Sequence, residues 1–197
     1  MYFAVTDSLS PEAVEPRLRG RFGHPYRHVA STPSTQLLLP PEAPEGALVA
    51  ADEQTAGRGR LGRRWLAPPG TSLLCSLQLR PTVASERLPE LTGVASRACA
   101  DAIAALTGLE PELKFPNDVL VGGRKVAGIL AEAREERVVL GIGVNVNVPA
   151  EELPQEVDRP ATSLLAETGR EVDRAELLAE LLEQLERRYD AWLSAAR

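Results

Sequence analysis

The sequence predicts an α+β fold in which several adjacent strands, joined by short turns, pack against amphipathic helices. Apolar runs over residues 47–51, 72–79, 124–130 and 138–148 have the length of strands. Strands and helices alternate, but without a strict β-α-β rhythm. The chain has 197 residues, 44% of them hydrophobic, which is enough to bury one sizeable core. We therefore expect a single domain over residues 1–197.

The first two expected strands, residues 47–51 and 72–79, enclose a loop rich in arginine and glycine. Residues 57–65 read Gly-Arg-Gly-Arg-Leu-Gly-Arg-Arg-Trp and have no hydrophobic period. Glycines let the backbone lie close against a ligand, and guanidinium groups bind phosphate or carboxylate through paired hydrogen bonds. The sequence therefore predicts an anion site. The flanking strands disfavour a solvated linker, and the formal net charge of −6 disfavours an RNA-binding segment.

Two segments have the apolar spacing of helices. The first ends at Gly108, and its apolar positions are Leu88, Leu91, Ala95, Cys99, Ala102, Ile103 and Leu106. The second begins at Asp173-Arg-Ala-Glu176, a sequence typical of a helix N-terminus, and continues with a leucine-rich face up to Trp192. Each of these helices is expected to bury one face against the strands.

Lysine and arginine together number 22 in this chain, and only two of them are lysines. Both lysines lie in the segment 114–125. Pro116 restricts Phe115 to extended geometry, so a strand is expected to end there in a turn that displays Asn117 and Asp118. Gly122-Gly123 predicts a tight hairpin whose return strand brings Lys125 near Asp118. Such a pair suits metal and phosphate chemistry, and a surface hairpin with an ion pair is the alternative interpretation.

Four motifs resemble those of the catalytic domain of biotin protein ligases, and they occur in that family's order and spacing. They are the loop at 57–65, Lys-Phe-Pro-Asn-Asp at 114–118, Gly-Arg-Lys-Val-Ala-Gly-Ile-Leu at 123–130 and Gly-Ile-Gly-Val-Asn-Val-Asn at 141–147. The resemblance covers about Ser31 to Leu165. It implies a mixed, largely antiparallel sheet flanked by helices, like that of class II aminoacyl-tRNA synthetases. It also implies activation of biotin by ATP to biotinyl-5′-AMP, followed by transfer to a lysine of a biotin carboxyl carrier protein.

The resemblance assigns catalytic roles to Lys125, Arg58 and Asp118. It implies that Lys125 contacts the biotin carboxylate and the α-phosphate, that Arg58 covers biotin and its adenylate, and that Asp118 helps to bind Mg²⁺ and orients the carrier lysine. The residues expected to contact ATP are Arg60 and Arg63 at the phosphates, and Asn117, Asn145 and Trp65 at the adenine. Cations at these positions suit a reaction that brings two anions together and releases pyrophosphate.

For biotin itself, the resemblance implies a pocket formed by Ser34, Thr35, Gln54, Gly57, Arg58, Lys125 and Gly128. Gln36 stands where the family usually has asparagine. An earlier Ser31-Thr32-Pro33 makes the register ambiguous by three residues. We assign Ser34-Thr35 because it directly precedes the apolar residues 37–39. Phe115 replaces the family's common tryptophan, an exchange of one large apolar ring for another.

Composition and the chain ends complete the prediction. Cys75 and Cys99 are expected to be buried thiols of a reducing compartment, and no segment resembles a signal peptide or the roughly 20 apolar residues of a membrane span. We therefore expect a cytoplasmic monomer or homodimer that does not bind membranes. Residues 1–30 are too few for the winged-helix domain of some relatives, so DNA binding is not expected. We also expect no C-terminal small β-barrel in this chain.

Two other functions remain open from the sequence. A lipoate or octanoate ligase or transferase would share the fold and the carrier chemistry, although a transferase needs a nucleophilic cysteine near its lysine, and neither cysteine has that context. A catalytically impaired biotin-binding module is the second alternative. Binding of biotin against lipoate distinguishes the first alternative, and pyrophosphate release from biotin and ATP distinguishes the second.

Overall fold

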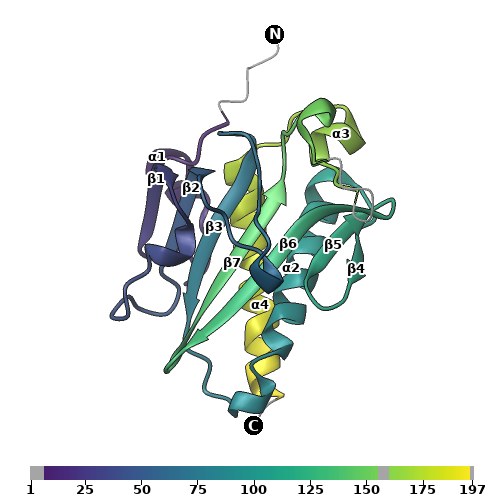
Figure 1. Cartoon of the computed structure of the whole chain (residues 1–197). Coiled ribbons are helices and arrows are strands. Elements are labelled where there is room, and N and C mark those ends of the chain that lie inside the picture. Colours follow the sequence, from purple (N-terminus) through teal and green to yellow (C-terminus); the bar gives the residue numbers. More distant parts are fainter. Residues whose placement is uncertain (1–6, 155–159, 196–197) are drawn as a thin grey trace.

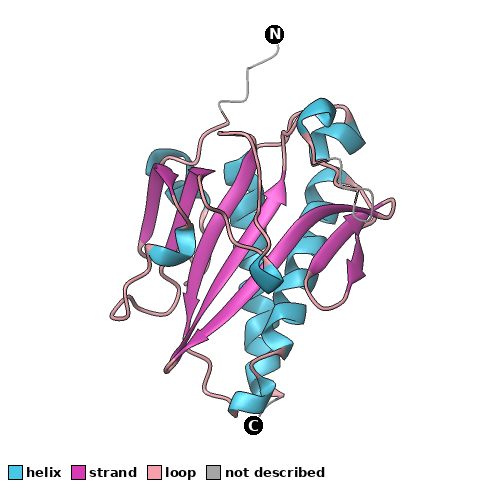
Figure 2. Cartoon of the chain, viewed as in Figure 1, coloured by secondary structure: helices cyan, strands magenta, loops and turns pink. Residues whose placement is uncertain are grey.

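A seven-stranded sheet organises the part of the chain that the computed structural model describes, residues 7–154 and 160–195 (Figures 1 and 2). Its strands are β1 (Tyr26–Thr32), β2 (Leu48–Gln54), β3 (Ser72–Leu79), β4 (Glu112–Lys114), β5 (Asp118–Val121), β6 (Arg124–Arg134) and β7 (Arg137–Asn145). They lie in the order β1-β2-β3-β7-β6-β5-β4. Only β1 and β2 pair in parallel, and every other neighbouring pair is antiparallel. The predicted mixed, largely antiparallel sheet is confirmed.

Two long helices cover one face of this sheet. The helices are α1 (Pro11–Val14), α2 (Glu90–Thr107), α3 (Leu164–Thr168) and α4 (Arg174–Ser194), with short 3-10 turns at Glu15–Arg17, Thr35–Leu37, Arg60–Gly62, Ser85–Arg87 and Ala150–Glu152. Helices α2 and α4 pack against each other behind the strands (Figure 1). As predicted, α2 ends at Gly108 with a left-handed φ of 73°, and the Asp173 carboxylate caps α4 by accepting from the backbone N–H groups of Ala175 and Glu176.

The central strands β6 and β7 separate the core from the opposite face by alternation, which is broken once, at Val126 and Ala127 of β6. On β7, Leu140, Ile142 and Val144 enter the core against the helices. The intervening residues of β7, Gly141, Gly143 and Asn145, point to the other face. On β6 the core residues are Val126, Ala127 and Ile129, and from Ala127 onward the alternation places Gly128, Leu130 and Glu132 on the outer face. The centre of that outer face therefore carries glycines beside Leu130, Glu132 and Asn145.

The predicted hairpin between β5 and β6 is also confirmed. Gly122 and Gly123 both have positive φ, 55° and 74°, the backbone that a two-residue turn of this type requires and that glycine adopts without steric cost. A register shift after Val119 places Asp118 opposite Gly128, while Leu120 lies opposite Lys125. The turn and the shift together fix which side chains face the same surface.

Residues before the predicted start of the family resemblance belong to the fold. From Tyr26 onward they form β1, and Leu9, Val14 and Phe22 join Tyr26 in the main hydrophobic core. The first six residues of the expected N-terminal extension lie outside the described residues. Its remainder is thus an integral part of the packed structure, which the sequence did not predict.

Both cysteines are free and buried, as predicted. Within the described ranges, none of the helices combines the length and the apolar character needed to cross a membrane.

Candidate active site

The arginine loop, residues 57–65, folds as a small hairpin across the face of the sheet opposite to α2 and α4 (Figure 1). The backbone N–H of Trp65 donates to the carbonyl oxygen of Gly57 at 2.9 Å, and that of Gly59 donates to Arg63 at 2.8 Å. Leu61 at its tip has a left-handed φ of 59° and is 84% exposed. The loop thus has a defined shape, which presents four arginines over the outer face of the strands.

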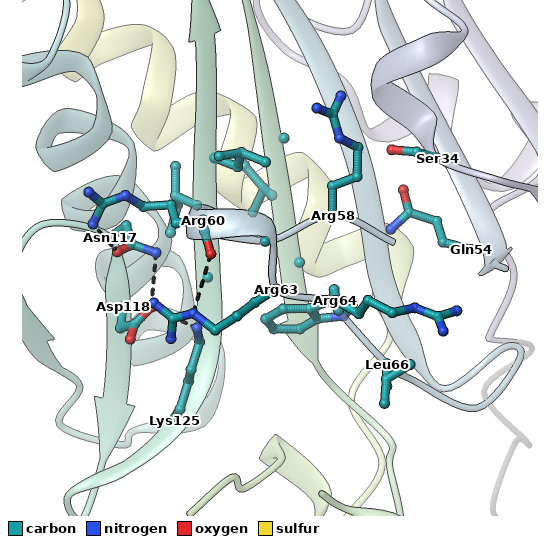
Figure 3. Close-up of a pocket in the computed structure, with 18 of the residues that line it drawn as sticks. Ser34, Gln54, Arg58, Arg60, Arg63, Arg64, Leu66, Asn117, Asp118 and Lys125 are labelled. Carbon is teal, nitrogen blue, oxygen red and sulfur yellow. Dashed lines mark hydrogen bonds and ion pairs between the residues drawn. The ribbon is translucent and has the colours of Figure 1, made fainter. Parts of the chain in front are cut away.

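Beneath this loop lies a pocket of about 240 Å³ (Figure 3). The predicted site residues that line it are Ser34, Thr35, Gln54, Arg58, Arg60, Arg63, Trp65, Asn117, Asp118, Lys125, Gly128 and Asn145. They come from β2, the loop, the β4–β5 turn, β5, β6, β7 and the short turn after β1. Residues far apart in the sequence are therefore brought to one cavity, as the sequence predicted.

Gly57 is the one predicted site residue that does not line the pocket. A Cβ built at this position would lie 2.6 Å from the Trp65 carbonyl oxygen and 3.2 Å from the Gln54 side-chain nitrogen. The structure therefore gives Gly57 a different reason to be glycine, because the two ends of the arginine loop could not approach so closely with a side chain present.

One end of the pocket is charged. The Lys125 ammonium lies 2.7 Å from an Asp118 carboxylate oxygen, and the Asn117 amide donates to the same oxygen at 3.0 Å. Arg60 donates to the Asn117 side-chain oxygen at 3.1 Å, and the Arg63 guanidinium donates to the Arg60 backbone at 3.3 Å. Figure 3 shows these five residues together on one side of the cavity. Three cations and one carboxylate leave this end with an excess of positive charge.

The other end is polar, and apart from arginines of the loop its lining groups are uncharged. Gln54 accepts from the Thr35 backbone N–H at 2.8 Å and from its hydroxyl at 3.1 Å, and that hydroxyl also bonds to Ser76 at 2.7 Å. Figure 3 places Gln54, Ser34 and Arg58 at this end, with the Arg58 guanidinium directed away from Lys125. Because the oxygen of Gln54 is held inside the protein, its amide nitrogen remains as a donor toward the cavity.

The structure distinguishes the two possible Ser-Thr registers. Ser34 and Thr35 are both 2% exposed and line the pocket. Ser31 lies on β1, outside the lining, where its hydroxyl donates to Glu53 at 2.7 Å. The geometry therefore favours the Ser34-Thr35 assignment.

Glycines of β6 and β7 form the floor of the pocket beneath Trp65. Cβ atoms built at Gly128 and Gly143 would lie 3.0 and 2.8 Å from the indole ring, so only glycine leaves room for it. The Lys125 ammonium lies 5.6 Å from the ring centroid, a cation–π distance. Trp65 was predicted beside the adenine, whereas the ring lies against Gly128, which was predicted to be close to biotin.

Several lining residues were not assigned from the sequence. They are Gln36, Gly59, Arg64, Leu66, Cys75, Ile129, Leu130, Gly141, Ile142, Gly143, Pro154 and Ala161. Strand alternation could have identified Gly141 and Gly143, since both share a face with the predicted Asn145. No sequence pattern indicates that Ala161 belongs to the site. It lies there because residues 160–162 pair with the backbone of Lys125.

Cys75 borders the pocket, but burial raises the pKa of its thiol to about 12. A protonated, buried thiol is a poor nucleophile.

The charged end has the donor set for one divalent cation shared with a substrate. No group of three or more His, Cys, Asp or Glu side chains gathers anywhere in the described residues. Mg²⁺ is commonly bound through one or two protein carboxylates together with substrate phosphates and water. Asp118 alone, beside cations that suit phosphates, fits that pattern and does not fit a closed protein cage.

Comparison with known proteins gives a consistent result. A model of the biotin/lipoate A/B protein ligase family matches residues 28–148. The bifunctional ligase/repressor BirA of Bacillus spizizenii is 42% identical over 157 residues, covering 77% of this chain and 48% of that protein. The biotin–[acetyl-CoA-carboxylase] ligase of Mycobacterium tuberculosis is 39% identical, covering 96% and 75% of the two chains. The chain spans about half the length of the BirA protein that it matches.

The fold also matches solved structures. Biotin protein ligase from Aquifex aeolicus in complex with biotin and ATP superposes with a TM-score of 0.78 at 34% identity, covering 86% of this chain and 72% of that one.

Proposed function

Because the chain belongs to the biotin/lipoate A/B protein ligase family, and within it to the biotin protein ligases, we propose that it ligates biotin to a carrier protein at the expense of ATP. The first step joins the biotin carboxylate to the α-phosphorus of ATP and releases pyrophosphate. In the second step a lysine amine of the carrier attacks the acyl carbon of biotinyl-5′-AMP, an amide bond forms and AMP leaves.

The observation that carries this proposal is the division of one pocket into two chemically different ends. Biotin has an uncharged ureido ring at one end and a carboxylate at the other, and its reaction partner is a polyphosphate. Thr35 and Gln54 offer neutral hydrogen-bonding groups, whereas Lys125, Arg60 and Arg63 offer cations at the opposite end. A ligand with a neutral polar head and an anionic tail fits this polarity.

Lys125 is the proposed contact between the two reacting anions. As the negative charge of the attacking carboxylate meets that of the α-phosphate, a cation held beside both lowers the repulsion and stabilises the charge of the transition state. Asp118 now holds this ammonium at 2.7 Å, which fixes its position before substrate arrives. Arg60 and Arg63 are proposed to bind phosphates, and Asn117, Asn145 and Trp65 to bind the adenosine side.

Asp118 is the proposed protein ligand of Mg²⁺, which when bound neutralises phosphate charge and assists the departure of pyrophosphate. The same carboxylate is proposed to orient the carrier lysine for the second step. Arg58 is proposed to cover biotin and its adenylate at the uncharged end. Retention matters because biotinyl-5′-AMP is a mixed anhydride that would otherwise hydrolyse or acylate unrelated amines.

The proposed partner is the biotin carboxyl carrier protein or domain of acetyl-CoA carboxylase, and the proposed location is the cytoplasm. The relatives' names support this carrier, since one of them is a biotin–[acetyl-CoA-carboxylase] ligase. We further propose that the protein acts as a monomer or homodimer and without binding DNA.

Pyrophosphate release from ATP tests the proposal directly. With biotin, ATP and Mg²⁺ we expect release that depends on biotin, and addition of a carrier domain should convert the adenylate into a biotinylated lysine. Lipoate and octanoate serve as competing substrates. Release with lipoate or octanoate and not with biotin would assign the chain to the other branch of the family, and biotin binding without any release would identify a binding module.

A further inference from the structure

Glu132 makes a two-pronged ion pair with the first arginine of the arginine loop. One Arg58 nitrogen lies 3.0 Å from Oε1 of Glu132, and the other donates to Oε2 at 3.2 Å. Glu132 lies on β6, two positions beyond the lining residue Leu130 and on the same face of the sheet. The side chain of Arg58 therefore connects the arginine loop to β6.

This ion pair differs in kind from the side-chain contacts of the other arginines in the loop. Arg60 donates to the Asn117 amide, Arg63 to a backbone carbonyl of the loop and Arg64 to the Thr55 carbonyl. In the chain as described, residues 7–154 and 160–195, Glu132 is the only carboxylate that forms an ion pair with an arginine of the loop. Since four arginines within seven residues repel one another, one fixed carboxylate has a large share in deciding where the loop settles.

Glu132 itself is well anchored and stands outside the pocket. The Glu132 side chain is 21% exposed, against 47% for Arg58. Glu132 is therefore the fixed partner, and Arg58 is the residue whose position the ion pair determines. Arg134, also on β6, pairs with the second carboxylate oxygen, Oε2, at 2.6 Å. Glu132 does not line the cavity.

A carboxylate beside an anion-binding pocket opposes the binding of anions, so its presence needs another reason. The contacts supply one, because the negative charge is neutralised by two arginines and the result is an Arg58 held over the uncharged end. We propose that Glu132 is a positioning residue, which holds Arg58 in its covering position and thereby slows the escape of the activated intermediate. This inference rests on the proposed biotin ligase function.

The test uses Glu132→Gln in the full chain, a substitution that keeps the shape and removes the charge. Biotinyl-5′-AMP should then leave the protein about three- to tenfold faster, the range expected when a partly exposed ion pair is lost. The KM for biotin should rise by a similar factor, whereas kcat for adenylate formation should fall much less, because Glu132 does not touch the reacting atoms. A merely structural defect would lower kcat and thermal stability together with any rise in KM.

Two control variants separate this role from a general effect of lost charge. Glu183→Gln removes a carboxylate from an exposed ion pair with Arg19, far from the pocket in the fold, and should leave release unchanged. Arg134→Gln removes the other partner of Glu132 and keeps the Arg58 pair, so release should change by less than about twofold. If Arg134→Gln releases the adenylate as fast as Glu132→Gln, the proposed route through Arg58 is wrong.

A double variant shows whether Glu132 acts through Arg58. Arg58→Gly alone should speed the release of biotinyl-5′-AMP. Adding Glu132→Gln should then produce no further acceleration, because the Arg58 side chain that Glu132 positions is already absent. Independent effects that multiply in the double variant would overturn the proposal.

Amide hydrogen exchange of ligand-free protein gives a readout that does not need activity. Residues 57–65 should exchange faster in Glu132→Gln than in wild type, and Glu132→Asp, which keeps the charge, should lie between them. Unchanged exchange refutes the positioning role. If wild type forms no adenylate, the proposed function fails, while the exchange result still decides whether Glu132 holds the loop.

Discussion

At the scale of single residues, Lys125 shows most clearly how position gives a common side chain a special role. Its side chain is 25% exposed, and its ammonium is ion-paired with Asp118 and close to the face of Trp65, whereas Lys114, the other lysine, is exposed on the edge strand β4. An ammonium is a compact point charge, and a planar guanidinium in the same space would have to displace the indole or the carboxylate.

We expect Lys125→Arg to lower the rate of adenylate formation at least about tenfold, or roughly 1.4 kcal/mol of transition-state stabilisation. Pyrophosphate release at saturating biotin and ATP measures it. Lys114→Arg is the matched control and should behave as wild type. A Lys125→Arg variant with the wild-type rate would remove Lys125 from the reaction.

The two cysteines give a second prediction at this scale. Burial raises the pKa of the Cys75 and Cys99 thiols from 9.0 to about 12. The folded-state pKa lies above the unfolded one, so the stability that comes from keeping both thiols protonated is fully present below pH 9 and is lost as the pH rises toward 12.

Both thiols should therefore resist a maleimide at neutral pH in the native protein and react once the chain is unfolded in guanidinium chloride. Mass spectrometry counts the added groups. Rapid labelling of native Cys75 would show that the pocket opens far enough to expose this thiol, and a covalent role for Cys75 would then have to be considered.

At the scale of elements, the arginine loop and the β6–β7 pair form the site together. The strands contribute a floor of glycines, and the loop contributes cations above it. Apart from Trp65, which packs against the glycines, the loop is held to the rest of the fold by few side chains, chiefly Arg58 to Glu132, Arg60 to Asn117 and Arg64 to Thr55. Such an element opens at low free-energy cost, and bound anions add contacts that oppose opening.

Amide exchange over residues 57–65 should accordingly slow when biotinyl-5′-AMP is bound, by about tenfold or more, while exchange in the paired strands β3 and β7 stays the same. Equal exchange with and without the ligand would mean that the loop is already as closed as it becomes.

At the scale of the whole molecule, Arg174 joins segments from both ends of the chain. Its side chain is 4% exposed and lies 2.8 Å from Asp7 and 3.1 Å from Asp52, and it donates to the Ser72 carbonyl at 3.2 Å. The N-terminal segment, β2, β3 and the first turn of α4 thus meet at one guanidinium. Asp52 also holds His28 at 2.9 Å, which brings β1 into the same network.

Replacing Arg174 with methionine should lower the free energy of unfolding by about 2–4 kcal/mol, because two partly buried carboxylates then lose their cation. Urea unfolding measures the change. Arg170→Met removes an exposed arginine a few residues away and should cost less than about 0.5 kcal/mol. Equal effects in the two variants would show that the network does not tie the ends of the chain together.

The sequence by itself determined the elements and indicated which residues gather around one pocket. The glycine pair specified the hairpin at residues 122–123, Gly108 specified the end of α2, and the capping residue Asp173 specified the start of α4. Each of these features depends on local backbone preference. The ordered motifs identified Lys125, Asp118 and the arginines of the loop as one site, and the structure brings them together in one pocket.

Only the tertiary structure decided how these parts meet. Arg58 pairs with a strand residue 74 positions away, Ala161 enters the site by pairing with Lys125, and residues before Ser31 complete the sheet and core. Gly57 proved to serve the closure of the loop, and Trp65 lies over the glycines of β6 and β7. Such contacts join residues that are distant in sequence, so they follow from how the sheet is ordered and how its faces are covered, and no local pattern encodes them.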